Sequence, residues 1–282
     1  MGRAAVARSP GHLSGYFRRI QGETARDTGS AGAGIVIQEG VTVKAVPAPE
    51  PRVEILSENR PVKAGLPLIE EAMERLGVSA RVTAESTLPA GAGFGLSAAG
   101  LLASISALSA LFELGLSDRD IAALAHEIEV VNRTGLGDVA ACQGGGIECR
   151  MGPGIGAEIV RIADPGSVLY AVSLGPILTP LILGDPNRMN RIAGAFPGRC
   201  PRDLGDFITL SRTFAEGSGL ITPRVREVLL ACDRAGIGAS MTMLGEGVFA
   251  VGEGAEAALS PFGKVFRLHV ASEGFRRGEV IG

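Results

Sequence analysis

The chain has 282 residues, of which 46% are apolar and 20% are charged, and its 27 basic and 30 acidic side chains give a formal net charge of −3. This balance excludes a disordered chain and a surface built to coat nucleic acid. The length suffices for one large or two ordinary domains with a buried core, and we expect a small-molecule partner.

The sequence contains no segment typical of export or of membrane insertion. The N-terminal MGRAAVARSPGHLSG lacks the apolar core of a signal peptide. The uncharged stretch 86–112 is interrupted by Pro89 and three glycines, which leaves a helix too short and too polar to span a bilayer. We therefore expect no contact with a membrane.

The four cysteines form neither a C-x-x-C pair nor the disulfide framework of a small secreted protein. Cys142 and Cys149, seven residues apart, are interpreted as small buried apolar residues rather than as a metal or redox site. With the absence of a signal peptide, this usage predicts a reducing compartment and a cytoplasmic location.

The first half of the chain is expected to hold clustered strands and three helices. Residues 34–46 are predicted to form a hairpin that turns at Glu39 and Gly40. An uncharged, buried helix of about 16 residues follows the glycine-rich segment 89–99, because apolar residues recur there at helical spacing. The other predicted elements are a strand at 52–56, a helix at 66–76, a strand at 80–86, a helix capped by Asp118 that runs to about 131, and a strand at 158–163.

Asp164, Pro165 and Gly166 mark the predicted boundary between a first domain (1–165) and a second (166–282). The second domain is expected to contain a strand at 168–174, a long loop at 175–201, helices at 203–216 and 223–235, two strands about Gly245 and Gly247, a short helix, and a strand at 265–271. Strands that cluster rather than alternate with helices favour an α+β fold over a doubly wound sheet.

The segment from Pro89 to Ala99 has the layout of an anion site, because a strand, a glycine-rich loop and a helix N-terminus follow one another. Glycines let the backbone approach a phosphate closely, and Ser97 places a hydroxyl where the helix begins. An ordinary helix start is the alternative. A Walker A loop is excluded, because none of the three lysines lies in a glycine-rich loop.

These residues carry a resemblance to a known family. The motif Pro89-x-x-x-Gly93-Phe94-Gly95-Leu96-Ser97-Ala98-Ala99 resembles the phosphate loop of the GHMP kinases, with Leu96 in place of the first serine of that motif. SPGHLSG (9–15) and GIGAS (236–240) stand where the first and third motifs of those kinases are expected. The blocks PGHLSGYF, GSAGAG, AHEIEVVNRTGLGDV and QGGG are similar to those of archaeal pantoate kinases.

The resemblance implies a GHMP kinase fold. Its N-terminal domain is similar to the second domain of ribosomal protein S5, its C-terminal domain is a ferredoxin-like α/β sandwich, and ATP and Mg²⁺ bind between them. The implied reaction transfers the γ-phosphoryl group of ATP to the terminal hydroxyl of (R)-pantoate, giving 4-phosphopantoate for coenzyme A synthesis in archaea. A homodimer is expected on the same ground.

The resemblance also assigns roles to individual residues. Asp138 is expected beside the attacking hydroxyl, with Ser97 and Glu129 as the magnesium ligands and as the other members of the catalytic set. Ser30, His126 and Arg150 are expected to contact pantoate, whereas His12 receives no chemical role. The expected ATP contacts are Pro89, Gly91, Gly93, Gly95, Ser97, Ala98 and Gly238.

Each role has a structural alternative. Asp138 could cap a helix or close a turn, and Ser30 could be a turn hydroxyl. Glu127 competes with Glu129, because the two point about 200° apart on a helix and whichever is not the ligand is expected to be solvated. Gly236, Gly238 and Ser240, expected to brace the phosphate loop, could instead form a helix C-cap and a turn.

Two other functions remain open from the sequence. One is a GHMP kinase that acts on homoserine, shikimate or mevalonate instead of pantoate. The other is a non-catalytic protein that binds a small molecule on the same scaffold.

Overall fold

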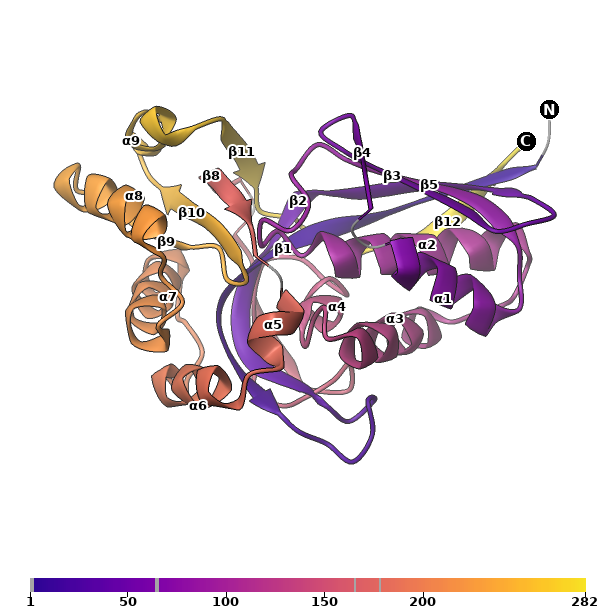
Figure 1. Ribbon diagram of the computed structural model, residues 1–282, viewed down its shortest axis with the longest axis horizontal. Helices are drawn as coiled ribbons and strands as arrows, with labels where there is room; N and C mark the ends of the chain where they lie inside the picture. Colours follow the sequence, from indigo (N-terminus) through magenta and orange to yellow (C-terminus); the bar gives the residue numbers. More distant parts are fainter. Residues whose placement is uncertain (1–2, 64–65, 165, 178) are drawn as a thin grey trace.

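The computed structural model describes residues 3–63, 66–164, 166–177 and 179–282. In these parts of the chain the secondary structure forms two sheets, each covered by helices (Figure 1). The larger sheet, with its helices, occupies one side of the molecule, and the smaller sheet occupies the other. The two long strands that begin the chain run between them.

The larger sheet has eight strands, with the order β12-β1-β2-β5-β3-β4 and with β6 and β7 branching from β2. Its centre is the antiparallel pair β1 and β2, and β2 pairs with β5 along its second half and with β6 along its first. The strands are β1 (Ala4–Ile20), β2 (Gly29–Pro47), β3 (Arg52–Ser57), β4 (Arg60–Val62), β5 (Ala80–Ser86), β6 (Ile147–Arg150), β7 (Ile159–Ile162) and β12 (Arg276–Ile281).

Helices α1 (Leu66–Leu76), α2 (Leu96–Leu111) and α3 (Asp118–Asn132) lie together on one face of this sheet (Figure 1). The predicted uncharged helix is confirmed as α2, and 13 of its 16 residues are buried. Its small side chains, such as Ala99 and Ala103, pack on the strands, while Leu101 and Ile105 face α1 and α3. Because α2 is packed between the strands on one side and α1 and α3 on the other, the position of its N-terminus is fixed.

The smaller sheet is antiparallel with the order β11-β8-β10-β9, and it is built from β8 (Val168–Pro176), β9 (Gly238–Met241), β10 (Gly245–Val251) and β11 (Val265–His269). Helices α7 (Leu204–Ser218) and α8 (Pro223–Arg234) pack against it, and α9 (Ala255–Leu259) follows β10. The α+β prediction is confirmed. Within the described residues, no helix is both long and apolar enough to cross a membrane.

The predicted hairpin at 34–46 is wrong, because β2 continues through the expected turn. Its pairing with β1 instead shifts register between Ile37 and Val41, which makes a bulge at Gln38, Glu39 and Gly40. A side chain on Gly40 would overlap the carbonyl oxygen of Ser9. The glycine therefore serves close backbone packing at the bulge rather than a chain reversal.

Three further expectations differ from the structure. The segment 175–201 contains α5 (Thr179–Leu183) and α6 (Pro186–Ala195) rather than a continuous loop, and Asp185 caps α6 just before a proline at its first position. The cap of α3 is Ser117 rather than Asp118. Val131, which helical spacing from Ile121, Ala125 and Ile128 predicts on the apolar face of α3, is 58% exposed.

The C-terminal strand β12 was not among the predicted elements. It pairs antiparallel with β1, so the chain returns to the larger sheet after it has built the smaller one. A division of the chain at residue 165 therefore leaves its last strand in the sheet of the first part. The pairing joins the two ends of the sequence, and no local sequence pattern indicates that these segments are neighbours.

Cys149 on β6 and Cys200 before α7 form a disulfide, so the interpretation of Cys149 as a free apolar residue is wrong. Cys142 is a free, buried cysteine as expected, and Cys232 is also free and buried. The disulfide joins the larger sheet to the helical segment that packs on the smaller one. Its presence also removes the cysteine argument for a reducing compartment.

We predict that breaking this disulfide destabilises the fold by about 4 kcal/mol, because the bond closes a loop of 51 residues. Urea unfolding with and without dithiothreitol measures the difference. Cys200→Ser should show the lower stability in both buffers, with no further response to the reductant. Equal midpoints for the oxidised and reduced wild-type protein would contradict the prediction.

Candidate active site

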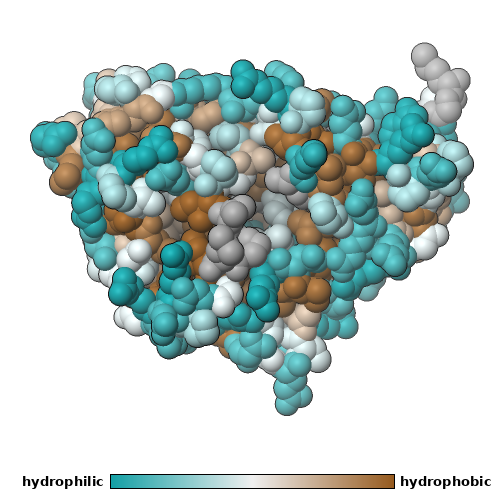
Figure 2. All heavy atoms as spheres, in the orientation of Figure 1, coloured by the Kyte–Doolittle hydropathy of each residue, from teal (hydrophilic) through white to brown (hydrophobic). Residues whose placement is uncertain are grey.

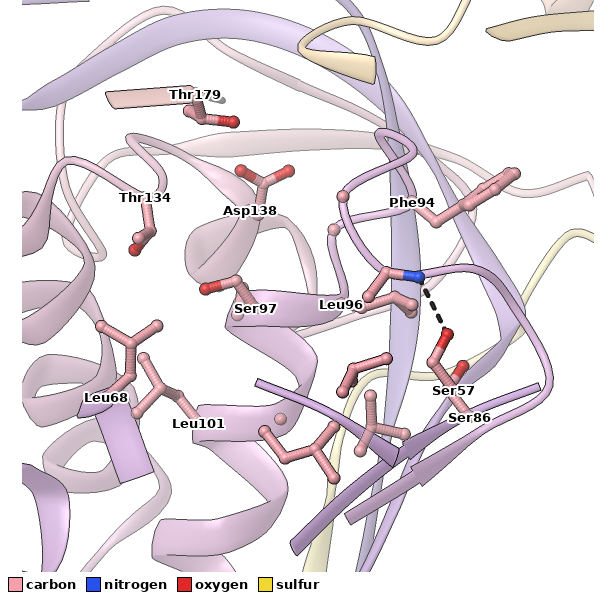
Figure 3. Close-up of a pocket in the computed structure, with 18 of the residues that line it drawn as sticks. Ser57, Leu68, Ser86, Phe94, Leu96, Ser97, Leu101, Thr134, Asp138 and Thr179 are labelled. Carbon is pink, nitrogen blue, oxygen red and sulfur yellow. Dashed lines mark hydrogen bonds between the residues drawn. The ribbon is translucent and has the colours of Figure 1, made fainter. Parts of the chain in front are cut away.

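A cavity of about 580 Å³ lies beside the N-terminus of α2. The glycine-rich loop after β5, the end of α3 and the start of α4 (Asp138–Ala141) contribute to its wall, together with residues after β8 and between β9 and β10. Ser97, Thr134 and Asp138 turn their side-chain oxygens toward this space (Figure 3). Apolar side chains flank the hollow on the face seen in Figure 2.

The glycine-rich loop adopts a backbone that other residues rarely take. Gly91, Gly93 and Gly95 have φ angles of 74°, 82° and 65°, all in the left-handed region. Each is also closely packed: a Cβ would lie 2.9 Å from Pro176 at Gly91, 2.8 Å from the Met243 carbonyl at Gly93, and 2.9 Å from His12 at Gly95. Residues of both sheets therefore pack closely against this loop. Glycine is required at all three positions.

Hydrogen bonds hold the same loop at each side. The His12 amide donates to the Phe94 carbonyl (2.9 Å), and the Ile177 amide donates to the Gly91 carbonyl (3.1 Å). The Ser57 hydroxyl accepts from the Ala90 amide (2.9 Å; Figure 3) and donates to the Leu88 carbonyl. The loop thus presents the free amides of the α2 N-terminus to the cavity in a fixed orientation.

The brace from the third motif lies a few residues later than the sequence predicts. Gly236 follows α8 at a φ of 69° with no atom within reach of a Cβ, and the nearest neighbours of Gly238 are Ile208 and Val251. Neither contacts the phosphate loop, and Ser240 is buried within β9. The residues that do contact it are Thr242 and Met243, between β9 and β10, and Gly245 at the start of β10.

Glu129, at the end of α3, is 2% exposed and lines the cavity. Burial and the nearby charge of Asp138 raise its pKa to about 8. Gly135 makes this placement feasible, because a Cβ there would overlap the Glu129 carboxylate. Glu127 is not among the residues that line the cavity and forms ion pairs with Arg26 and Arg75, so of the two glutamates Glu129 is the one that faces this space, and its role as a metal ligand stays a prediction.

The Ser97 hydroxyl is buried and has no hydrogen-bond partner among the described residues, although it lies near enough to the Glu129 carboxylate to lower the pKa of that group. It lies in the first turn of α2 and lines the same cavity as Glu129. An unpaired buried hydroxyl costs free energy unless a ligand satisfies it. Ser97 is therefore suited to contact a bound group.

Asp138 is the first residue of the one-turn helix α4 and lines the cavity. Its Oδ1 lies 2.7 Å from Nδ1 of His12. Removal from water favours the neutral carboxyl, but the hydrogen bond and charge of His12 outweigh it and lower the pKa of Asp138. Asp138 is therefore a carboxylate at neutral pH.

His12 lies fully buried on β1 between two acidic side chains. Its Nε2 lies 3.1 Å from Oε1 of Glu148 on β6, and that carboxylate also pairs with Nη1 of Arg150. Burial opposes a charge on the ring, but hydrogen bonds to Asp138 and Glu148 prevail and raise the pKa of His12. Asp138, His12, Glu148 and Arg150 thus form a row of alternating charge.

The three expected substrate residues are buried, and one of them, Arg150, is itself a member of this row. Arg150 donates from Nε and Nη2 to the backbone and side-chain oxygens of Ser30, each at 3.1 Å. His126 bonds through Nε2 to the Thr28 carbonyl (2.8 Å), and burial lowers its pKa. None of the three lines the 580 Å³ cavity, so a substrate contact through them stays a prediction.

His12 and Glu148 are the two residues of this site that the sequence reasoning missed. His12 received no role because PGHLSG by itself does not show what its histidine faces. Glu148 lies 136 positions from His12 in a short buried strand. The available signal was an acidic residue inside an otherwise apolar run ending in arginine (IECR), since charges are rarely buried without a partner.

Comparison with known proteins places the chain in a family. Residues 53–146 match the model of the GHMP kinases N terminal domain. A pantoate kinase from Methanospirillum hungatei is 43% identical over 94% of this chain and 93% of its own. The chain belongs to the pantoate kinase family of the GHMP kinases.

More distant relatives agree with this assignment. A pantoate kinase from Thermococcus kodakarensis is 32% identical over 88% of this chain and 87% of its own. A solved structure described as a phosphotransferase related to the CoA biosynthesis pathway superposes with a TM-score of 0.81 at 27% identity and covers 98% of both chains. The two-domain fold of the GHMP kinases is therefore shared over the whole chain.

Gly137→Ala should reduce turnover about a hundredfold, because a Cβ there would overlap the Arg150 guanidinium, which Ser30 and Glu148 hold in place. The φ of Gly137 is −152°, so alanine adds no backbone strain. Gly194→Ala in α6 is the control, because a Cβ there meets no atom within 4 Å. Steady-state kinetics on both variants measure the effect, and equal activity would contradict it.

Proposed function

We propose that this protein phosphorylates (R)-pantoate to (R)-4-phosphopantoate with ATP, as a step of coenzyme A synthesis. The observation that carries the proposal is the position of the Asp138 carboxylate. It shares one cavity with Ser97 at the α2 N-terminus, where phosphates are expected. Membership in a kinase family makes ATP the phosphoryl donor.

The nucleotide is proposed to lie along the cavity with its phosphates at the glycine-rich loop. The free amides at the α2 N-terminus and the helix dipole stabilise the phosphate charge there. Val41, Ile55 and Leu68 add apolar lining to the same cavity, which suits the base. The loop cannot retreat when phosphate binds, because both sheets contact its glycines.

Ser97 and Glu129 fit a magnesium ion. One supplies an unpartnered buried hydroxyl and the other a buried carboxylate, both oxygen ligands of the kind that Mg²⁺ prefers. No group of three acidic, cysteine or histidine side chains suited to a metal is present in the described residues. Phosphate oxygens and water would therefore complete the coordination, and the bound ion would neutralise charge that develops on the phosphates.

Asp138 is proposed to accept the hydrogen bond of the attacking hydroxyl. Its Oδ1 is engaged by His12, and the carboxylate faces the cavity where the terminal phosphate would lie. Phosphoryl transfer through a loose transition state depends mainly on positioning and charge stabilisation. A carboxylate with a lowered pKa is suited to orienting the hydroxyl and to receiving its proton late in the transfer.

Arg150, Ser30 and His126 are proposed to form the side of the site that receives the acid. The Arg150 guanidinium lies against Gly137, directly before Asp138 in the chain. Three of its donor positions are engaged by Ser30 and Glu148, and the remaining two N–H groups suit a carboxylate. A homodimer and a cytoplasmic location stay predictions.

The test is ADP release from ATP and Mg²⁺ with (R)-pantoate, homoserine, shikimate or mevalonate supplied separately. Turnover with pantoate alone supports the proposal, and Asp138→Ala should then lose most of kcat while ATP binding is kept. Turnover with another alcohol would overturn the proposed substrate but keep the ATP site. No turnover with any of the four would instead indicate a binding protein.

The apparent affinity for Mg²⁺ should rise with pH through about pH 8, because protonated Glu129 cannot act as a ligand and its pKa is about 8. Below that pH a proton must leave before the ion binds. Titrating activity against Mg²⁺ at constant ATP from pH 6.5 to 9 measures this. Glu129→Gln should bind the ion weakly without the pH trend, whereas Glu127→Gln should behave like wild type.

A further inference from the structure

Glu148 is wholly buried and lies outside the cavity, so it touches neither the proposed nucleotide site nor the acceptor hydroxyl. Its Oε1 is shared between His12 Nε2 and Arg150 Nη1. Its Oε2 is buried without a hydrogen-bond partner among the described residues. Burying a carboxylate completely costs free energy unless its interactions compensate for the lost hydration. The contacts of Glu148 must therefore supply that compensation.

The geometry around His12 supplies that reason. A carboxylate can only accept hydrogen bonds, and His12 has one on each ring nitrogen, Asp138 at 2.7 Å and Glu148 at 3.1 Å. Only the doubly protonated ring donates to both. Glu148 thus fixes the orientation and the charge of the ring that binds Asp138.

The strands leave space for this contact. Gly34 on β2 lies between the two partners, paired with Ser14 on β1 and with Glu148 on β6. A Cβ on Gly34 would overlap Nε2 of His12. The ring therefore reaches across the central strand at a point where no side chain intervenes, which gives Gly34 of the GSAGAG block a specific role.

We propose that Glu148 is a positioning residue for phosphoryl transfer, which acts through His12 to hold Asp138 oriented toward the acceptor hydroxyl. This inference rests on the proposed function of Asp138. The groups facing His12 are Asp138 from α4 and Glu148 from β6; its charge also acts on Glu129 from α3, and Arg150 pairs with Glu148. Without the Glu148 carboxylate, the buried His12 ring loses one of the two hydrogen-bonded negative charges that favour its protonated form.

The first measurement uses the wild-type protein. The chain has three histidines, so ¹⁵N-histidine labelling gives few signals, and His126→Asn and His269→Asn assign them. At pH 7.5 we expect both nitrogens of His12 to be protonated in the wild type, and the ring to be neutral in Glu148→Gln. A neutral His12 in the wild-type protein overturns the proposal without any need for the variant.

The second measurement is kinetic. In Glu148→Gln the amide oxygen can still accept from Arg150 and His12, as Oε1 does, but the negative charge that favours the doubly protonated ring is lost. We expect kcat to fall about tenfold to a hundredfold while the KM for ATP changes less than threefold. Glu246→Gln is the matched control, because Glu246 also accepts from an arginine and one further donor, in the smaller sheet.

A double-mutant cycle separates positioning from general damage. If Glu148 acts through His12, Glu148→Gln should lower kcat less than twofold when made in His12→Asn. Equal losses in both backgrounds, or an unchanged kcat in the single variant, would overturn the proposal. Failure of the proposed function is a distinct result, because the wild-type enzyme would then not phosphorylate pantoate.

Discussion

The site depends on the burial of a row of charges where β1, β2, β6 and α4 meet. The charges along this row alternate in sign from Asp138 through His12 and Glu148 to Arg150. Each hydrogen bond between neighbours therefore offsets part of the free-energy cost of removing both charges from water. Such a row tolerates no gap, because removal of one member leaves another charge buried without a partner. It also fixes Asp138 relative to the sheet rather than to a surface loop.

Glycine makes these buried contacts possible. At Gly34 and Gly137 the absent side chains leave room for the His12 ring and the Arg150 guanidinium, and neither position has the left-handed backbone that also favours glycine. The phosphate loop uses glycine differently, since Gly91 and Gly93 need both a positive φ and close packing. The glycines of this site are therefore required for two separate physical reasons, which are space for a neighbouring side chain and a left-handed backbone.

Short sequence patterns predicted the elements that are determined by neighbouring residues in the chain. The strand, loop and helix layout around Ser97 was visible in the sequence, and the structure brings Ser97, Glu129 and Asp138 to one cavity. Contacts between distant segments were not predictable, including the pairing of β12 with β1 and the contact between His12 and Glu148. The bulge at Gly40 resembles a turn in sequence, because both require a residue without a side chain.

Asp138 and Glu129 line the same cavity, yet the protein shifts their pKa values in opposite directions. His12 bonds directly to Asp138 and keeps it ionised, whereas Glu129 has no positive partner at hydrogen-bond distance among the described residues and its pKa rises to about 8. Two adjacent carboxylates with different environments take different tasks. Asp138 is ready to receive a hydroxyl before any ligand arrives, while Glu129 becomes a favourable anion only when a cation binds beside it. The row that contains Glu148 creates this difference, because the ring nitrogens of His12 bond to Asp138 and Glu148, and the charge of the ring acts on Glu129 only more weakly.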